Sequence, residues 1–270
     1  MQVPESSTSG PAPAANCLYA GRLADSQSFV GCCGWAEAQA RYVTHFQAIE
    51  IQTTFYQPPT IAVAERWKSK APPGFRFCMK AWQLITHAPS SPTYRRLKSG
   101  ISRNERDLYG SFLPTEQVWL AWERTREIAD ILDAQVIVFQ CPKSFQPTRE
   151  STANLTEFFG RIDRDSRTVA WEPRGDGWSP ELIRELCAEN NLIHCVDPFT
   201  SDSILGDGLY WRLHGRTSYR YRYTDDDLAE LNAKLQAQAR GPGPNYIMFN
   251  NIYSRDDALR FRSAAGLGAT

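Results

Sequence analysis

Short apolar segments of strand length recur along most of this chain, and amphipathic segments separate many of them. The apolar segments are rich in Val, Ile, Phe, Tyr and Trp, and turn residues bound several of them, which is typical of buried strands. They occupy residues 29–35, 46–52, 76–82, 135–141, 168–174, 193–198, 209–215 and 246–251. Apolar stripes and helix start and stop signals predict helices at residues 60–71, 115–134, 179–191 and 225–239.

Strands that alternate with helices predict a parallel sheet, and eight is the strand number that closes a (β/α)8 TIM-like barrel. We therefore expect one α/β barrel domain over residues 28–270, with irregular helices. The first connection has room only for a short helix, and the connection at 197–208 is too short for a full one. Residues 83–114 form a predicted insertion after the third strand. Residues 1–27, dominated by Ser, Pro, Ala and Gly, predict a disordered head.

The composition of the chain argues against several classes of protein. The 270 residues carry 30 basic and 30 acidic side chains, and this zero net charge is not the footprint of a generally basic nucleic-acid binder. No apolar run reaches the roughly 18 residues of a membrane helix, so we expect no membrane partner. The seven cysteines include no Cys-x-x-Cys pair, which gives no disulfide framework or zinc motif. With no recognisable secretory signal, we expect a cytoplasmic protein.

Polar and charged side chains gather at the carboxyl ends of the predicted strands, where parallel barrels place their active sites. Residues two apart share one face of a strand, so Glu172 and Arg174 face the same way, as do Arg212 and His214. Buried charges need partners or a wet pocket, and structural salt bridges are the alternative to an active site. The candidate catalytic residues are Glu50, Glu172 and His214, and the candidate substrate-binding residues are Tyr56, Lys80, His87, Arg174, Arg212, Asn250 and Asn251.

This set suits acid–base chemistry on a small anionic ligand, phosphorylated or carboxylated and sugar-like. Lys80, Arg174 and Arg212 would hold the anion. Glu50 and Glu172 are candidate general bases, with His214 as the acid or its orienter. No glycine-rich nucleotide-binding loop is present, and the simplest version of the chemistry requires no cofactor.

A divalent metal on Glu172, Asp197 and His214 is the alternative cofactor hypothesis. Nearby cationic side chains oppose it, and the eighth strand offers Asn250 and Asn251 where sugar isomerases of the xylose-isomerase-like class have a further acid. Cys33, at the end of the first strand, is a possible nucleophile, but we expect a packed strand cysteine.

Two segments are locally basic. Residues 76–106 hold seven basic residues and one acidic residue, and residues 208–224 hold four arginines and no acid. The second segment interleaves Arg with Tyr, as surfaces that bind single-stranded nucleic acid do. A nucleic-acid-binding or phosphodiester-processing protein is therefore the alternative function, and a non-catalytic ligand-binding barrel is a second alternative.

The chain also resembles a known family. The motifs are GCCGW (31–35), EIQTTFYQPP (50–59), ERW (65–67), GFRFCMKAWQLITH (74–87), WEPR (171–174), RLHGR (212–216) and MFNN (248–251). In order and spacing they are similar to the YecE-like family, domain of unknown function seventy-two, over about residues 29–262. The resemblance implies a TIM barrel and implies no activity. It places these residues on family motif positions: Glu50, Phe55, Tyr56, Lys80, Thr86, His87, Glu172, Arg174, Arg212, His214, Gly215, Asn250 and Asn251.

The chain departs from the family pattern at the first motif. Only 15 positions separate Trp35 from Glu50, so the first loop and helix are shortened. A lid role for that loop is therefore in doubt.

Overall fold

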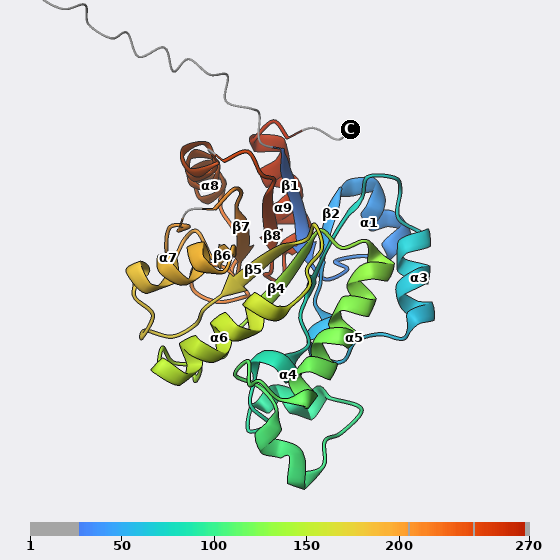
Figure 1. Ribbon diagram of the computed structural model, residues 1–270. Helices are drawn as coiled ribbons and strands as arrows, with labels where there is room; N and C mark the ends of the chain where they lie inside the picture. The colour runs from blue at the N-terminus through green and yellow to red at the C-terminus, as the bar shows by residue number, and fades with distance from the viewer. Residues whose placement is uncertain (1–26, 205, 240, 268–270) are drawn as a thin grey trace, which may run out of the picture.

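Eight parallel strands form a closed barrel, in which each strand pairs with the next and the last pairs with the first (Figure 1). The structure is a computed structural model and describes residues 27–204, 206–239 and 241–267. The strands are β1 (Ser28–Cys33), β2 (Ala48–Ile51), β3 (Arg76–Lys80), β4 (Val136–Gln140), β5 (Thr168–Glu172), β6 (Ile193–Val196), β7 (Tyr210–Leu213) and β8 (Asn245–Phe249). Every strand overlaps a predicted apolar segment, which confirms the single TIM-like barrel.

Helices surround the barrel (Figure 1). They are α1 (Gln39–His45), α2 (Thr53–Tyr56), α3 (Ile61–Ser69), α4 (Gln83–Thr86), α5 (Glu116–Leu132), α6 (Arg149–Arg161), α7 (Pro180–Glu189), α8 (Asp225–Gln238) and α9 (Ser254–Ala264). The four predicted helices correspond to α3, α5, α7 and α8, whereas α6 and α9 are not among the predicted ones. Helix α7 begins as the sequence indicates, because Ser179 caps it by accepting from the Leu182 amide and Pro180 follows. None of the described helices is long and apolar enough to cross a bilayer.

Alternation along the strands creates two cores. In β4, Val136 and Val138 belong to a cluster inside the barrel, whereas Ile137 and Phe139 belong to the core between the barrel and its helices. The interior cluster comprises Phe29, Ala48, Cys78, Val136, Val138, Ala170, Cys195, Tyr210, Tyr246 and Met248. The next inward position of β4 is the polar Gln140, so the apolar interior ends near the carboxyl ends of the strands.

The connections between strands have the lengths that the sequence predicts. Helix α1 has seven residues, and its Tyr42 hydroxyl accepts from the Cys32 amide at 2.7 Å and donates to the Ala48 carbonyl at 2.9 Å. One buried hydroxyl thus joins β1 to β2 on the outer side of the barrel. The connection from β6 to β7 contains no helix among its described residues, as expected.

The insertion after β3 consists of α4 and the 3-10 helices η1 (Pro92–Arg96) and η2 (Arg103–Leu108), at the lower end of Figure 1. Its end is joined to its start by three backbone hydrogen bonds to α4, from Gly110 to Leu84, from Ser111 to Thr86 and from Phe112 to Ile85. The predicted disordered head lies, apart from Gln27, outside the described residues.

The return segment of the insertion is strained and firmly packed. Gly110, Ser111 and Phe112 all have positive φ, which is costly for the two residues that are not glycine. The Phe112 ring lies 5.3–6.2 Å from the rings of Phe139, Phe145, Phe158 and Phe159, measured between centroids. This aromatic packing offsets the backbone strain and fixes the insertion to the barrel.

Candidate active site at the carboxyl ends of the strands

A buried charged layer lies on top of the apolar interior. It consists of Glu50 on β2, Lys80 on β3, Gln140 on β4, Glu172 on β5 and Arg212 on β7, each almost fully buried. Each of these residues is the last or next-to-last residue of its strand. The sequence predicted that Glu50, Lys80, Glu172 and Arg212 lie at this end of the barrel, and the structure brings them together.

Arg212 links two carboxylates across the barrel. Its Nε donates to Glu50 Oε2 at 3.0 Å, and its NH1 donates to Glu172 Oε2 at 2.5 Å. The Tyr210 hydroxyl also donates to Glu50 Oε2, at 3.0 Å. Burial alone would lower the pKa of Arg212, but Glu172 and Glu50 hold it well above its usual value. The guanidinium is therefore committed to this network, and its predicted anion-binding role stays a prediction.

Glu172 accepts from a second arginine. Arg174 Nε and NH2 donate to Glu172 Oε1 at 2.8 and 2.6 Å. Burial would raise the pKa of Glu172, but Arg212 and Arg174 outweigh it and hold this pKa at about 2. A carboxylate this acidic is a weak base at neutral pH, so the geometry does not favour the general-base role expected for Glu172.

Lys80 lacks a carboxylate partner. Its Nζ donates to Gln140 Oε1 and lies 3.8 Å from the centroid of the Phe55 ring. No ion pair among the described residues includes Lys80, because Arg212 and Arg174 occupy the nearby carboxylates. Burial and the charge of Arg212 lower the pKa of Lys80 to about 7.

His87 lies beside Lys80 and stays neutral. Its Nδ1 forms a 2.8 Å hydrogen bond with the Thr86 hydroxyl, and its ring meets Phe55 edge-on, with centroids 4.8 Å apart. Burial, together with the charges of Lys80 and Arg174, lowers the pKa of His87 to about 3. The imidazole can therefore donate or accept hydrogen bonds but does not carry charge at neutral pH.

His214 forms the rim of the layer with Asp197. Asp197 Oδ2 accepts from the His214 amide at 2.8 Å and lies 3.4 Å from His214 Nδ1. The His214 side chain is 32% exposed, but its Nε2 is itself buried and has no hydrogen-bond partner in the described part of the chain. Asp197 thus orients an imidazole whose second nitrogen is buried and left without a partner among the described residues.

Two further predicted residues lie around the charged layer. Asn250 Oδ1 accepts from Gln52 at 3.0 Å, which places Asn250 beside the charged layer because Gln52 also donates to Glu50, at 3.2 Å. Tyr56 lies at the edge, with the Arg96 guanidinium 3.6 Å from its ring centroid.

Asn251 faces away from the layer. Its Nδ2 donates to the Tyr221 carbonyl at 2.8 Å and to Asp257 Oδ2 at 2.7 Å. These contacts join the loop after β7 to α9. Asn251 therefore has a structural role in this fold, and its predicted substrate-binding role stays a prediction.

The residues considered for a metal do not form a metal-binding group. Both oxygens of Glu172 accept from guanidinium groups, and both oxygens of Asp197 accept from backbone amides, of Phe199 and His214. Within the described ranges, no three His, Cys, Asp or Glu side chains are placed to hold a metal ion. The donor set at Glu172, Asp197 and His214 therefore does not fit a divalent cation.

Cys33 is a weak candidate nucleophile. Burial and the charge of Glu50 raise the pKa of its thiol well above the usual value, which suppresses the thiolate. Tyr210, which contributes a hydroxyl to the network, is not among the site residues predicted from the sequence. Strand alternation was the available signal, because Tyr210 stands two positions before Arg212 on the same face.

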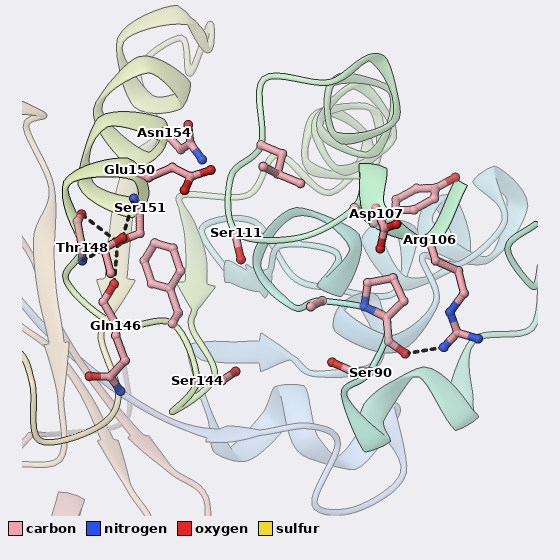
Figure 2. Close-up of a pocket in the computed structure, with 15 residues that line it drawn as sticks. Ser90, Arg106, Asp107, Ser111, Ser144, Gln146, Thr148, Glu150, Ser151 and Asn154 are labelled. Carbon is pink, nitrogen blue, oxygen red and sulfur yellow. Dashed lines mark hydrogen bonds between the residues drawn. The ribbon is translucent and has the colours of Figure 1, made fainter. Parts of the chain in front are cut away.

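A hollow of about 510 Å³ lies between the insertion and the start of α6 (Figure 2). One wall is the insertion, including Ser90, Arg106 and Asp107, and the other is the loop after β4 with the first turns of α6. Thr148 and Ser151 cap α6 reciprocally, so the first amides of that helix are already partly satisfied. The hollow does not lie over Arg212 or Glu172, and the convergent charged groups mark the candidate site more specifically than its volume does.

The closed parallel barrel and the polar layer at its carboxyl ends define a TIM-barrel protein with a candidate site in the usual position for that fold. The chain belongs to the family described as "Protein of unknown function DUF72", whose model matches residues 29–268. No curated protein matches the sequence.

Solved structures share this fold. A DUF72 family protein from Enterococcus faecalis V583 is 19% identical, with a TM-score of 0.70, and the match covers 91% of this chain and 100% of that one. A DUF72 family protein from Thermotoga maritima MSB8 is 20% identical, with a TM-score of 0.65 and coverage of 89% and 99%. A D-psicose 3-epimerase is 10% identical, with a TM-score of 0.54 and coverage of 90% and 98%.

Proposed function

We propose that the protein is an enzyme that performs acid–base chemistry on a small anionic, sugar-like substrate at the carboxyl ends of its strands. The observation that carries this proposal is the arrangement of side chains at the rim of the charged layer. There, the partly exposed Arg174 and the oriented His214 stand beside the buried ion pairs that Arg212 makes. Such an arrangement offers an anion-binding group and a proton-transfer group within a preorganised frame.

The structure suggests a distinct role for each group. Arg174, whose side chain is 35% exposed, is accessible to a phosphate or carboxylate at the rim. In this proposal His214 exchanges a proton through Nε2, which is buried and has no partner among the described residues, while Asp197 holds its other nitrogen. Arg212 is almost fully buried and positions Glu50 and Glu172. Similarity of fold to a D-psicose 3-epimerase supports a sugar-like substrate by analogy alone.

Solvent deuterium incorporation tests this proposal. Sugar phosphates and hydroxy or keto acids are incubated with the protein in D2O and analysed by mass spectrometry. We expect deuterium in at least one compound, a loss of at least about tenfold in H214Q, as for one acid–base group, and a higher KM in R174A. The control R161A changes an exposed arginine on α6 that pairs with Glu157. Absence of both deuterium incorporation and binding across the panel would reject the proposal.

Nucleic-acid binding is a second candidate, favoured by one surface feature. Tyr219 and Tyr253 are 56% and 39% exposed in the loops after β7 and β8. Arg220 and Arg222 lie 5.8 and 5.7 Å from the ring centroids of Tyr219 and Tyr253, respectively, and neither arginine joins a described ion pair. Exposed aromatic rings with unneutralised arginines suit stacking on single-stranded bases.

Fluorescence anisotropy with a short labelled single strand at two salt concentrations tests this candidate. Binding should weaken log-linearly with salt. The double variant Y219A/Y253A should lose at least about tenfold in affinity, since stacking contributes ~1–3 kcal/mol per base. R161A serves again as the control. No binding at low salt would reject the candidate.

A further inference from the structure

The surroundings of Lys80 solvate an ammonium group poorly. Lys80 ends β3, its side chain is directed into the barrel, and the residue is only 4% exposed. Its Nζ contacts the face of Phe55 and the amide oxygen of Gln140. By contrast, the more exposed Lys68 and Lys234 each pair with an aspartate.

The nearby charges do not compensate for this burial. Glu50 and Glu172 favour the protonated amine, but Arg212 and Arg174 occupy both carboxylates and oppose protonation. His87 on the same side carries no charge at neutral pH, because its pKa is about 3. These groups and burial together lower the pKa of Lys80 to about 7. Much of the amine is therefore neutral, and hence nucleophilic, at physiological pH.

We propose that Lys80 is a covalent nucleophile that captures an aldehyde or ketone group of the substrate as a Schiff base. This inference rests on the proposed function and narrows its substrate class to small anionic carbonyl compounds. The neutral amine attacks the carbonyl carbon, and proton transfer from nitrogen to oxygen gives a carbinolamine. The C–O bond then breaks, and the oxygen leaves as water with both amine protons. The product is an imine between Lys80 Nζ and the former carbonyl carbon, formed without a redox change.

The position of Lys80 suits this chemistry. An imine on Nζ places the adjacent carbon atoms of the substrate at the carboxyl end of the barrel. Arg174 lies at the same end and can bind an anionic group of the substrate. Protonation of the imine makes neighbouring C–H bonds more acidic, which is the property that the acid–base chemistry of this site requires.

Reductive trapping with glyoxylate, a small anionic aldehyde, tests the proposal. The full-length protein is treated with glyoxylate and cyanoborohydride between about pH 6 and 10, and carboxymethyl-lysine is located by peptide mass spectrometry. At pH 7 the labelling rate at Lys80 should exceed that at the exposed Lys143 by at least about tenfold, because an ordinary lysine is almost fully protonated there. The Lys80 profile should have its midpoint near pH 7.

A charge-changing variant of its neighbour gives the decisive comparison. Gln140→Glu places a carboxylate where the Lys80 amine now meets an amide oxygen, so the amine should stay protonated and labelling at pH 7 should fall at least about tenfold. Gln146→Glu introduces the same charge at an exposed position in the loop after β4 and should leave the labelling unchanged. Circular dichroism and thermal melting confirm that each variant is folded.

Two results would overturn the inference. One is a Lys80 that stays unlabelled below pH 9 while Lys143 reacts, since a substrate carbonyl could not reach the amine either. The other is unchanged labelling at pH 7 in folded Gln140→Glu. Deuterium incorporation that depends on His214 would survive both results, so failure of this inference is distinguishable from failure of the proposed function.

Discussion

Arg212 Nε on β7 donates to Glu50 Oε2 on β2 across 3.0 Å of the barrel interior, although 162 residues separate the two. Both side chains are almost fully buried. The pair therefore joins opposite parts of the sheet in a place that water does not reach. Its energetic value lies in keeping two buried charges compensated rather than in net attraction.

Removal of this arginine should destabilise the fold strongly. In Arg212→Ala, Glu50 and Glu172 lose their shared partner, and we expect a loss of about 3–5 kcal/mol in the free energy of unfolding, typical of breaking a buried pair. Urea denaturation measures it. Arg216→Ala, which removes ion pairs to Asp227 and Glu230 from a partly exposed side chain, should cost only about 1 kcal/mol. Similar losses in the two variants would contradict our description of the network.

Acid should destabilise the protein through Glu172. Its pKa in the folded state is about 2, below the 4.5 of an unperturbed glutamate, so the unfolded chain binds the proton first as pH falls. The stability that this carboxylate supplies is complete above pH 4.5 and is lost as pH falls toward 2. Glu172→Gln should therefore show a shallower loss of stability than wild type between about pH 5 and 3. The matched control is Glu157→Gln on α6, and equal acid slopes in all three proteins would refute the assignment.

Alkali should stabilise the protein through Lys80. Its folded-state pKa is about 7 against 10.5 for an unperturbed lysine, so between these values the unfolded chain binds more protons. The contribution of Lys80 to the free energy of unfolding therefore rises with pH from about 7 to 10. Lys80→Met should lack this rise, which a comparison of urea midpoints at about pH 7 and 9 measures. A parallel pH dependence in wild type and Lys80→Met would show that the amine is not perturbed.

Two glycines allow a matched test of the insertion. Gly110 and Gly74 both have positive φ, at 85° and 80°, but a Cβ at Gly110 would lie 2.4 Å from the His87 carbonyl oxygen, whereas one at Gly74 would meet nothing within 4 Å. Gly74→Ala should cost about 1–2 kcal/mol, from backbone conformation alone. Gly110→Ala should cost more and should also speed proteolysis within residues 88–109. Equal melting temperatures for the two variants would indicate that the close contact is unimportant.

The strands could be predicted because a barrel strand needs a short, continuous apolar segment, and β4 and β5 supply it almost without interruption. The pair of Glu172 and Arg174 could also be predicted, because it depends only on alternation along one strand. The link between Arg212 and Glu50 could not, since their contact depends on closure of the sheet.

Adjacent residues show another limit of the sequence argument. Asn250 and Asn251 were both assigned to the site, but successive residues near the end of a strand face opposite sides. Asn250 meets Gln52 beside the charged layer, whereas Asn251 meets Asp257. Likewise, the carboxylates near Lys80 are already paired with arginines. This pairing arises only in the folded network, so the sequence near Lys80 does not predict it.

The pairing of β1 with β8 bears on whether the order of the strands along the chain can be changed. Five residue pairs join the two strands. Helix α9 is attached to α1 by a hydrogen bond from Arg262 to the His45 carbonyl, and to the loop before α1 by an ion pair between Arg255 and Glu37. The first and last elements are therefore neighbours in space, as Figure 1 shows. A circular permutant that joins α9 to β1 through a linker and opens the chain in the exposed turn before β3 would keep all eight strand pairings. In such a barrel the order of synthesis is separable from the order of assembly, so the charged layer should form whichever strand is made first.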